Sequence, residues 1–326
     1  MSRIDCHAHF NPAEYDVQVA KTMGPTPISA WNTDQQLAMM ARYDIDASVV
    51  SIPPPGVFMG DVAQAKDLAR MVNEAGATLI RNYPSQFAAL AALPLPNVDA
   101  ALEELHYALD ILHLDGIALF THIGERYLGH PDWATLFDEL NRRRTYVFVH
   151  PAIPTQGSPL KHLPPWLIEF PFETTRALTN LLYSGTLARC PDIKFQFAHM
   201  GGAVPFLAGR IASLVKRAPP AARIAEQVPA GPLEYLKTLY YDTGLSNNAP
   251  ALQATLQVTT LDHIVFGLDW PYADLPTHGD PAPGLNYLGV TERAKIESAN
   301  AAALVPRLTN NQPLAASRQS PTASHQ

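Results

Sequence analysis

The sequence predicts an α/β fold, a (β/α)₈ barrel that forms one domain over residues 1–308. Eight short apolar segments, rich in β-branched and aromatic residues, alternate with amphipathic helical patterns. The apolar runs are almost unbroken, which is typical of parallel strands buried on both faces. An open doubly wound sheet would need a glycine-rich phosphate loop after the first strand, and the chain has none there.

The individual elements follow from these patterns. The predicted strands are 3–10, 46–52, 87–93, 116–122, 145–150, 193–200, 239–244 and 263–270. The predicted helices are 32–43, 61–84, 98–109, 132–143, 173–190, 205–217, 249–258 and 291–305. Prolines gather in stretches such as SIPPPG and HLPPW, which indicate rigid loops. Residues 309–326 are polar and lack a pattern, so we expect a disordered tail there.

Composition limits the partners of the chain. The net charge is −7 and no block of lysine or arginine occurs, which argues against nucleic acid. No apolar run reaches the roughly 18 residues that span a bilayer, and the start lacks the features of a secretory signal. With only two cysteines, Cys6 and Cys190, we expect no disulfide framework and a cytoplasmic location. Cys6 is expected to be a packed thiol that points away from His7.

Polar residues mark the ends of four predicted strands. His7 and His9 are two apart on the first strand and therefore face the same side. His150, His199 and Asp269 end the fifth, sixth and eighth strands. The carboxyl ends of barrel strands meet at one mouth, where catalytic groups lie. Each histidine alone is more often structural, but together they favour a metal site, because imidazole and carboxylate suit Zn²⁺.

The ordered motifs DCHAH, FVHP, FAHMGG and FGLDWPY resemble the metal-dependent amidohydrolase superfamily. Residues 163–211 resemble its aminocarboxymuconate-semialdehyde decarboxylase branch, and look closest to decarboxylases of 6-methylsalicylate and other hydroxybenzoates. The resemblance covers about residues 3–307. It implies one divalent cation, Zn²⁺ as first choice and Mn²⁺ as the alternative, with the following ligands: His7, His9, His150 and Asp269. His199 is implied to be catalytic, and a homodimer is implied as well.

The resemblance implies a non-oxidative decarboxylase, a carbon–carbon lyase, of a small aromatic or enol-type carboxylic acid. The short first loop, residues 10–32, holds no arginine, which favours a 6-methylsalicylate-like acid over the muconate semialdehyde. His199 and Asp269 are both candidates for delivering the proton, and the sequence leaves the choice open. A hydrolase of a lactone or amide is the alternative function, and an inactive barrel used for binding is a third.

Further residues are candidates for the surroundings of the site. Arg176 in FPFETTR is a candidate for binding the substrate carboxylate, unless it is a plain surface arginine. Glu173 is a candidate for orienting a metal-binding histidine. The alternative is a carboxylate at a helix N-terminus, where the helix dipole favours a negative charge. Four aromatic residues in predicted loops are candidate walls of an aromatic pocket: Phe58, Trp166, Trp270 and Tyr272. Asp242 is expected to support the site or to make a structural hydrogen bond, and His122 lies outside the metal set.

Overall fold

The computed structural model describes residues 3–24, 31–219 and 222–309. Eight parallel strands form one sheet in the order β1-β2-β3-β4-β7-β8-β9-β10. Hydrogen bonds from the backbone N of Cys6 to Phe266 O and from His9 N to Trp270 O, both 2.8 Å long, close the sheet into a barrel. The predicted (β/α)₈ fold is confirmed.

Each predicted strand overlaps a barrel strand, and the last three barrel strands are shorter than predicted. The barrel strands are β1 (Ile4–His9), β2 (Ala47–Ser51), β3 (Phe87–Ala92), β4 (Gly116–Phe120), β7 (Tyr146–His150), β8 (Lys194–Phe197), β9 (Tyr240–Asp242) and β10 (Ile264–Val265). A small antiparallel hairpin outside the barrel, not predicted, consists of β5 (His122–Ile123) and β6 (Arg126–Tyr127). It directly follows β4 and so lies at the mouth of the barrel.

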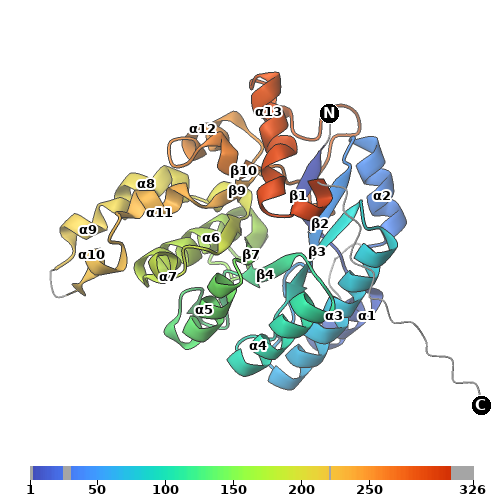
Figure 1. Cartoon of the computed structure of the whole chain (residues 1–326), viewed down its shortest axis with the longest axis horizontal. Coiled ribbons are helices and arrows are strands. Elements are labelled where there is room, and N and C mark those ends of the chain that lie inside the picture. The colour runs from blue at the N-terminus through green and yellow to red at the C-terminus, as the bar shows by residue number, and fades with distance from the viewer. Residues whose placement is uncertain (1–2, 25–30, 220–221, 310–326) are drawn as a thin grey trace, which may run out of the picture.

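Helices surround the strands, and α8 to α11 extend to one side (Figure 1). They are α1 (Ala13–Met23), α2 (Thr33–Arg42), α3 (Val62–Asn82), α4 (Val98–His106), α5 (Ala134–Arg142), α6 (Pro165–Tyr183), α7 (Thr186–Arg189), α8 (Val204–Ala212), α9 (Leu214–Arg217), α10 (Ile224–Gln227), α11 (Pro232–Lys237), α12 (Ala249–Thr255), α13 (Val290–Glu297) and α14 (Pro306–Thr309). Asparagine or aspartate side chains cap four N-termini, at Asn32, Asp61, Asn97 and Asn248.

The largest departure from the predicted helices concerns α6. It begins at Pro165 and contains Pro171, whereas the sequence predicts a loop up to residue 172. Pro165 occupies the first turn, where a missing N–H costs no helical hydrogen bond. The helix therefore includes the segment WLIEF, and Trp166 lies on a helix rather than in a loop, with its side chain largely exposed.

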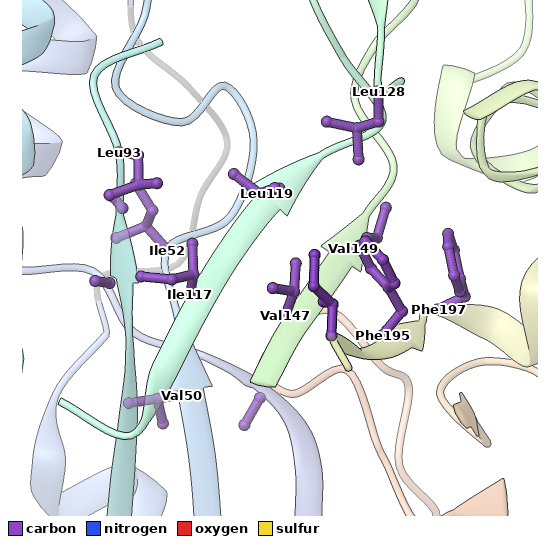
Figure 2. Close-up of a cluster of buried hydrophobic side chains, with 14 of the residues drawn as sticks. Val50, Ile52, Leu93, Ile117, Leu119, Leu128, Val147, Val149, Phe195 and Phe197 are labelled. Atoms are coloured by element: carbon purple, nitrogen blue, oxygen red, sulfur yellow. The ribbon is translucent and has the colours of Figure 1, made fainter. Parts of the chain in front are cut away.

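Two hydrophobic clusters build the core. The larger one fills the layer between strands and helices. Figure 2 shows part of it, with labelled side chains on or beside β2, β3, β4, β7 and β8. The smaller cluster lies inside the barrel and includes Ile4, Cys6, Tyr146 and Phe148. Burial of both layers holds the strands at a fixed spacing and so fixes the positions of residues at their ends.

Strand β1 contains an irregularity that places its polar residues. The register with β2 shifts between Asp5 and Ala8, as in a β-bulge. Cys6 packs in the cluster inside the barrel, and the ring of its neighbour His7 lies 4.8 Å from that of Phe148 in the same cluster. The expectation that Cys6 points away from His7 is wrong, because the bulge breaks the alternation of sides. Cys6 and Cys190 are both buried free thiols.

The C-terminal end of the described chain is helical. Thr309, which the sequence places in a disordered tail, is the last residue of α14. The rest of that predicted tail, residues 310–326, lies outside the described residues. Across the described parts of the chain, every helix is too short or too polar to cross a membrane.

Candidate metal centre and active site

Four side chains from three strands of the barrel meet at its mouth. His7 and His9 come from β1, His150 ends β7, and Asp269 lies four residues beyond β10. All four are buried, and one ligand atom from each lies within 4.8 Å of the others. The Nε2 atoms of His7 and His9 are 3.2 and 2.9 Å from Oδ1 of Asp269. The structure thus brings the four predicted metal ligands together.

The orientation of these atoms fits a cation. The Nε2 atoms of the three histidines and Oδ1 of Asp269 are buried, and none of them makes a hydrogen bond. Four potential ligand atoms thus lie close together without being hydrogen-bonded to one another. Buried polar atoms without a partner are costly, and a divalent cation would satisfy all four at once.

The second nitrogen of each histidine is anchored by an acceptor. Nδ1 of His7 lies 3.1 Å from Oδ1 of Asp242, and Nδ1 of His150 lies 2.8 Å from the carbonyl oxygen of Pro151. Nδ1 of His9 lies 3.2 Å from the carbonyl oxygen of Ser51. Acceptors at Nδ1 fix the proton there and leave Nε2 as a lone pair for a metal.

Two glycines make room for the His7 ring. A Cβ on Gly244 would lie 2.7 Å from Nδ1 of His7, and one on Gly267 would lie 2.7 Å from its Cβ. Both distances are far below van der Waals contact. The two glycines, each two residues beyond β9 or β10, therefore let the imidazole lie against the backbone that follows these strands.

Burial and charge set the protonation of the ligands. Burial lowers the pKa of His9, and it lowers that of His150 further with the help of the neighbouring histidines. Burial also opposes charge on His7, but the carboxylates of Asp242 and Asp269 outweigh it and raise the pKa of His7 to about 10. For Asp269 burial favours the neutral acid, yet the charge of His7 and the hydrogen bond with His199 hold its pKa well below the ordinary value. The site therefore presents Asp269 as a carboxylate, and His7 must lose the proton on its Nε2 before that nitrogen can bind a cation.

His199 lies beside the ligand set and is oriented by two carboxylates. Its Nε2 is 3.1 Å from Oδ2 of Asp269, and its backbone N–H donates to Oδ1 of Asp242 over 3.0 Å. Its ring centroid is 5.2 Å from that of His7. His199, Met200 and Asp269 all have a positive φ of 55 to 67°, a conformation that costs non-glycine residues energy and often marks functional sites.

Replacing Asp242 with asparagine is expected to weaken metal binding about 10- to 100-fold, because the neutral amide oxygen is a weaker acceptor for the Nδ1–H of His7 than the carboxylate. Isothermal titration of the metal-free protein measures this. Asp262→Asn, at an exposed carboxylate paired with Lys295, is the matched control. Unchanged affinity in Asp242→Asn would show that the Asp242–His7 contact does not orient the ligand.

Phe58 and Phe120 line an apolar cavity of about 400 Å³ next to the ligands. The cavity lies over the ends of β2, β3, β4 and β7. The Phe120 ring is 6.1 Å from the His150 ring, so this side chain borders both the cavity and the metal ligands. Phe120 escaped the sequence analysis because an aromatic residue at a strand end is indistinguishable there from a core residue.

Glu173 and Arg176 line a second cavity, of about 440 Å³, that adjoins the first. The Glu173 carboxylate accepts hydrogen bonds from Tyr127 over 2.7 Å and from Arg176 over 2.5 Å, and lies 3.4 Å from Nε2 of His122. Its contacts are thus with these three residues rather than with a predicted metal ligand. The structure does not bring Glu173 or Arg176 to the four ligands.

Two other candidate wall residues, Trp270 and Tyr272, are not among the described residues that line the apolar cavity. Trp270 lines a different cavity, next to α2, while its backbone oxygen bonds to β1. Tyr272 lies beside the site, with its ring 5.4 Å from that of His9. Phe170 of α6 lies 6.0 Å from the His150 ring and was missed, because the sequence places its segment in a loop.

Known proteins are similar to this chain in sequence and in fold. A decarboxylase from Penicillium terrestre is 35% identical over 295 residues, which are 85% of this chain and 86% of that protein. The 6-methylsalicylic acid decarboxylase of Penicillium expansum is 30% identical over 321 residues, or 94% of this chain and 97% of that one. The crystal structure of a dihydroxybenzoic acid decarboxylase from Polaromonas sp. JS666, with bound manganese and an inhibitor, has the same fold. Its TM-score is 0.79 at 20% identity, over 95% of this chain and 98% of that chain.

The family model described as amidohydrolase matches residues 4–307, almost the whole barrel. The resemblance to the amidohydrolase superfamily and to its decarboxylase branch is thereby confirmed. From the matched barrel and the four converging ligands, we conclude that the chain belongs to the amidohydrolase family.

Proposed function

We propose that this protein is a metal-dependent, non-oxidative decarboxylase of a small hydroxyaromatic carboxylic acid. The observation that carries the proposal is the pairing of His199 with Asp269 beside a buried set of metal ligands, at the edge of an uncharged cavity. Relatives that share most of their length with the chain are decarboxylases, one of them of 6-methylsalicylic acid.

The ligand set His7, His9, His150 and Asp269 would hold one divalent cation. When bound, the cation supplies a template and a Lewis acid for the carboxylate and its ortho-hydroxyl. We take Zn²⁺ as first choice, because three imidazoles and a carboxylate are donors that it favours. Mn²⁺ is the alternative, and manganese is bound in the Polaromonas enzyme.

The residues of the chain handle the proton and exclude water. His199 and Asp269, 3.1 Å apart, can share one proton and present it to the ring carbon that bears the carboxylate. When that carbon takes the proton, the bond to the carboxylate breaks, CO₂ leaves and the electron pair returns to the ring. The rings of Phe120, Phe170 and Tyr272 border the histidines and keep the reacting carbon in an apolar environment.

A substrate screen tests this function against hydrolysis. Protein loaded with Zn²⁺ or Mn²⁺ is expected to decarboxylate salicylate, 6-methylsalicylate or 2,6-dihydroxybenzoate, followed by ultraviolet absorbance and released CO₂. Muconic acids are expected to react poorly, because the described residues that line the apolar cavity carry no cation for a second carboxylate. Opening of lactones or amides without CO₂ release from any acid would instead favour the hydrolase alternative.

Two further expectations accompany the proposal, a homodimer and a cytoplasmic location. Both come from the sequence and from the resemblance, and both stay predictions. Size-exclusion chromatography with light scattering measures the first, and cell fractionation measures the second.

A further inference from the structure

The half of the barrel mouth away from Asp269 is apolar. Its cavity of about 400 Å³ lies in the range of about 300–1,000 Å³ that small-molecule sites occupy. Leu95, Ala92, Ala118 and Phe58 contribute to its lining. None of the described residues that line it is a lysine, arginine, aspartate or glutamate.

The cavity adjoins the metal ligands. Phe120 on β4 pairs in register with His150 on β7 and also lines the cavity. A single-ring acid held at the ligands by its carboxylate and its ortho-hydroxyl would therefore direct the edge that carries position 6, on the other side of the carboxylate, past the Phe120 ring into this space. A methyl group on that edge would fill only a small part of it.

Two polar side chains, His122 and Thr155, are among the described residues that line the cavity. His122 contributes the one imidazole among the described lining residues. Its Nδ1 lies 2.9 Å from the carbonyl oxygen of Gly124, and its buried Nε2 lies 3.4 Å from Oε2 of Glu173 without a hydrogen bond. Arg176 lines only the neighbouring cavity, where it pairs with Glu173. Away from His122 and Thr155, a polar substituent would lose its hydration without finding a side-chain partner in the lining, whereas an alkyl chain would gain by burial.

We infer that the preferred substrate is a hydroxyaromatic acid with an apolar side chain longer than a methyl group, and that the cavity selects it by enclosing this chain. The inference rests on the proposed function for the position of the carboxylate. Ala92, at the end of β3, and Leu95, just beyond it, are the residues that set the depth available to the chain.

A series of 2-hydroxybenzoic acids with hydrogen, methyl, propyl or pentyl at position 6 tests the inference. With metal-loaded protein, KM is expected to fall about fourfold for each added methylene until the cavity is full. A KM that stays level or rises beyond methyl would overturn the inference while leaving the decarboxylase proposal intact. Calorimetric binding of the corresponding 3-alkylphenols, which are the products, gives a readout that needs no turnover. Alkylphenol affinity that rises with chain length, in protein that decarboxylates none of the acids, would overturn the proposed function and support the apolar site.

Ala92→Phe fills the cavity and provides the matched variant. It is expected to bring the KM of the pentyl acid back to that of the methyl acid. Ala63→Phe makes the same change on the exposed surface of α3, outside the cavity, and should retain the dependence on chain length. If KM of Ala92→Phe still falls with alkyl chain length as it does in the unmodified protein, the inference is overturned. If Ala92→Phe does not fold, the series on the unmodified protein still decides.

Discussion

Replacement of His199 with alanine is expected to lower the rate of decarboxylation by about 10²- to 10⁴-fold, the range that a positioned acid or base contributes. The imidazole is one of the two partners that hold the proton, and its Nε2 lies 3.1 Å from Oδ2 of Asp269. It does not belong to the four converging ligand atoms, so the metal content should remain close to that of the unmodified protein. Elemental analysis and CO₂ release, measured on the same preparation, check both parts.

His106→Ala is a suitable control for this variant, since that imidazole is exposed and lies in a surface ion network. It should change neither the metal content nor the rate. Normal turnover in metal-loaded His199→Ala would remove His199 from the reaction. Loss of the metal would make it a part of the binding site instead.

Replacement of Asp269 with alanine is expected to abolish both metal retention and decarboxylation. Its Oδ1 is the only carboxylate oxygen among the four ligand atoms and lies within 3.2 Å of two histidine nitrogens. Without it three neutral imidazoles remain, and the positive charge of the cation loses its direct counter-charge. After dialysis we expect less than a tenth of the metal that the unmodified protein retains, measured by elemental analysis.

Thermal unfolding gives a second readout for the same variant. A cation at 100 times its Kd should stabilise the unmodified protein by about 2.7 kcal/mol, because it binds the folded chain only. Asp269→Ala should show no shift in Tm on addition of Zn²⁺ or Mn²⁺. Asp262→Ala, which removes an exposed carboxylate, should keep the full shift. Stoichiometric metal in Asp269→Ala would contradict the assignment of this ligand.

The barrel and the four ligands could be predicted because their signals are local. A buried parallel strand is an apolar run, and a ligand at its end is a single polar residue, as at His150 and Asp269. The anchors of the histidines carry no such signal. The acceptors for His9 and His150 are the backbone carbonyls of Ser51 and Pro151, which every residue type provides.

Other features of the site depend on packing between distant elements. The bulge in β1 appears only when that strand pairs with β2, so alternation alone gives the wrong side for Cys6. The start of α6 was missed because its prolines indicate a loop unless they fall in the first turn. Glu173 lies at a helical spacing from Arg176 in the sequence, but its contacts with Tyr127 and His122 arise from the tertiary fold.

The closure of the barrel has a consequence for how folding and metal binding are coupled. Asp5 in β1 accepts a hydrogen bond from the backbone of Leu268, which lies 263 positions away in the chain. The ligands His7 and Asp269 lie on the two sides of this same junction. The cation site therefore cannot exist in a growing chain until its last strand has been synthesised and has docked on the first. Metal uptake therefore requires the closed barrel, and a bound cation would join the first strand to the segment that follows the last strand.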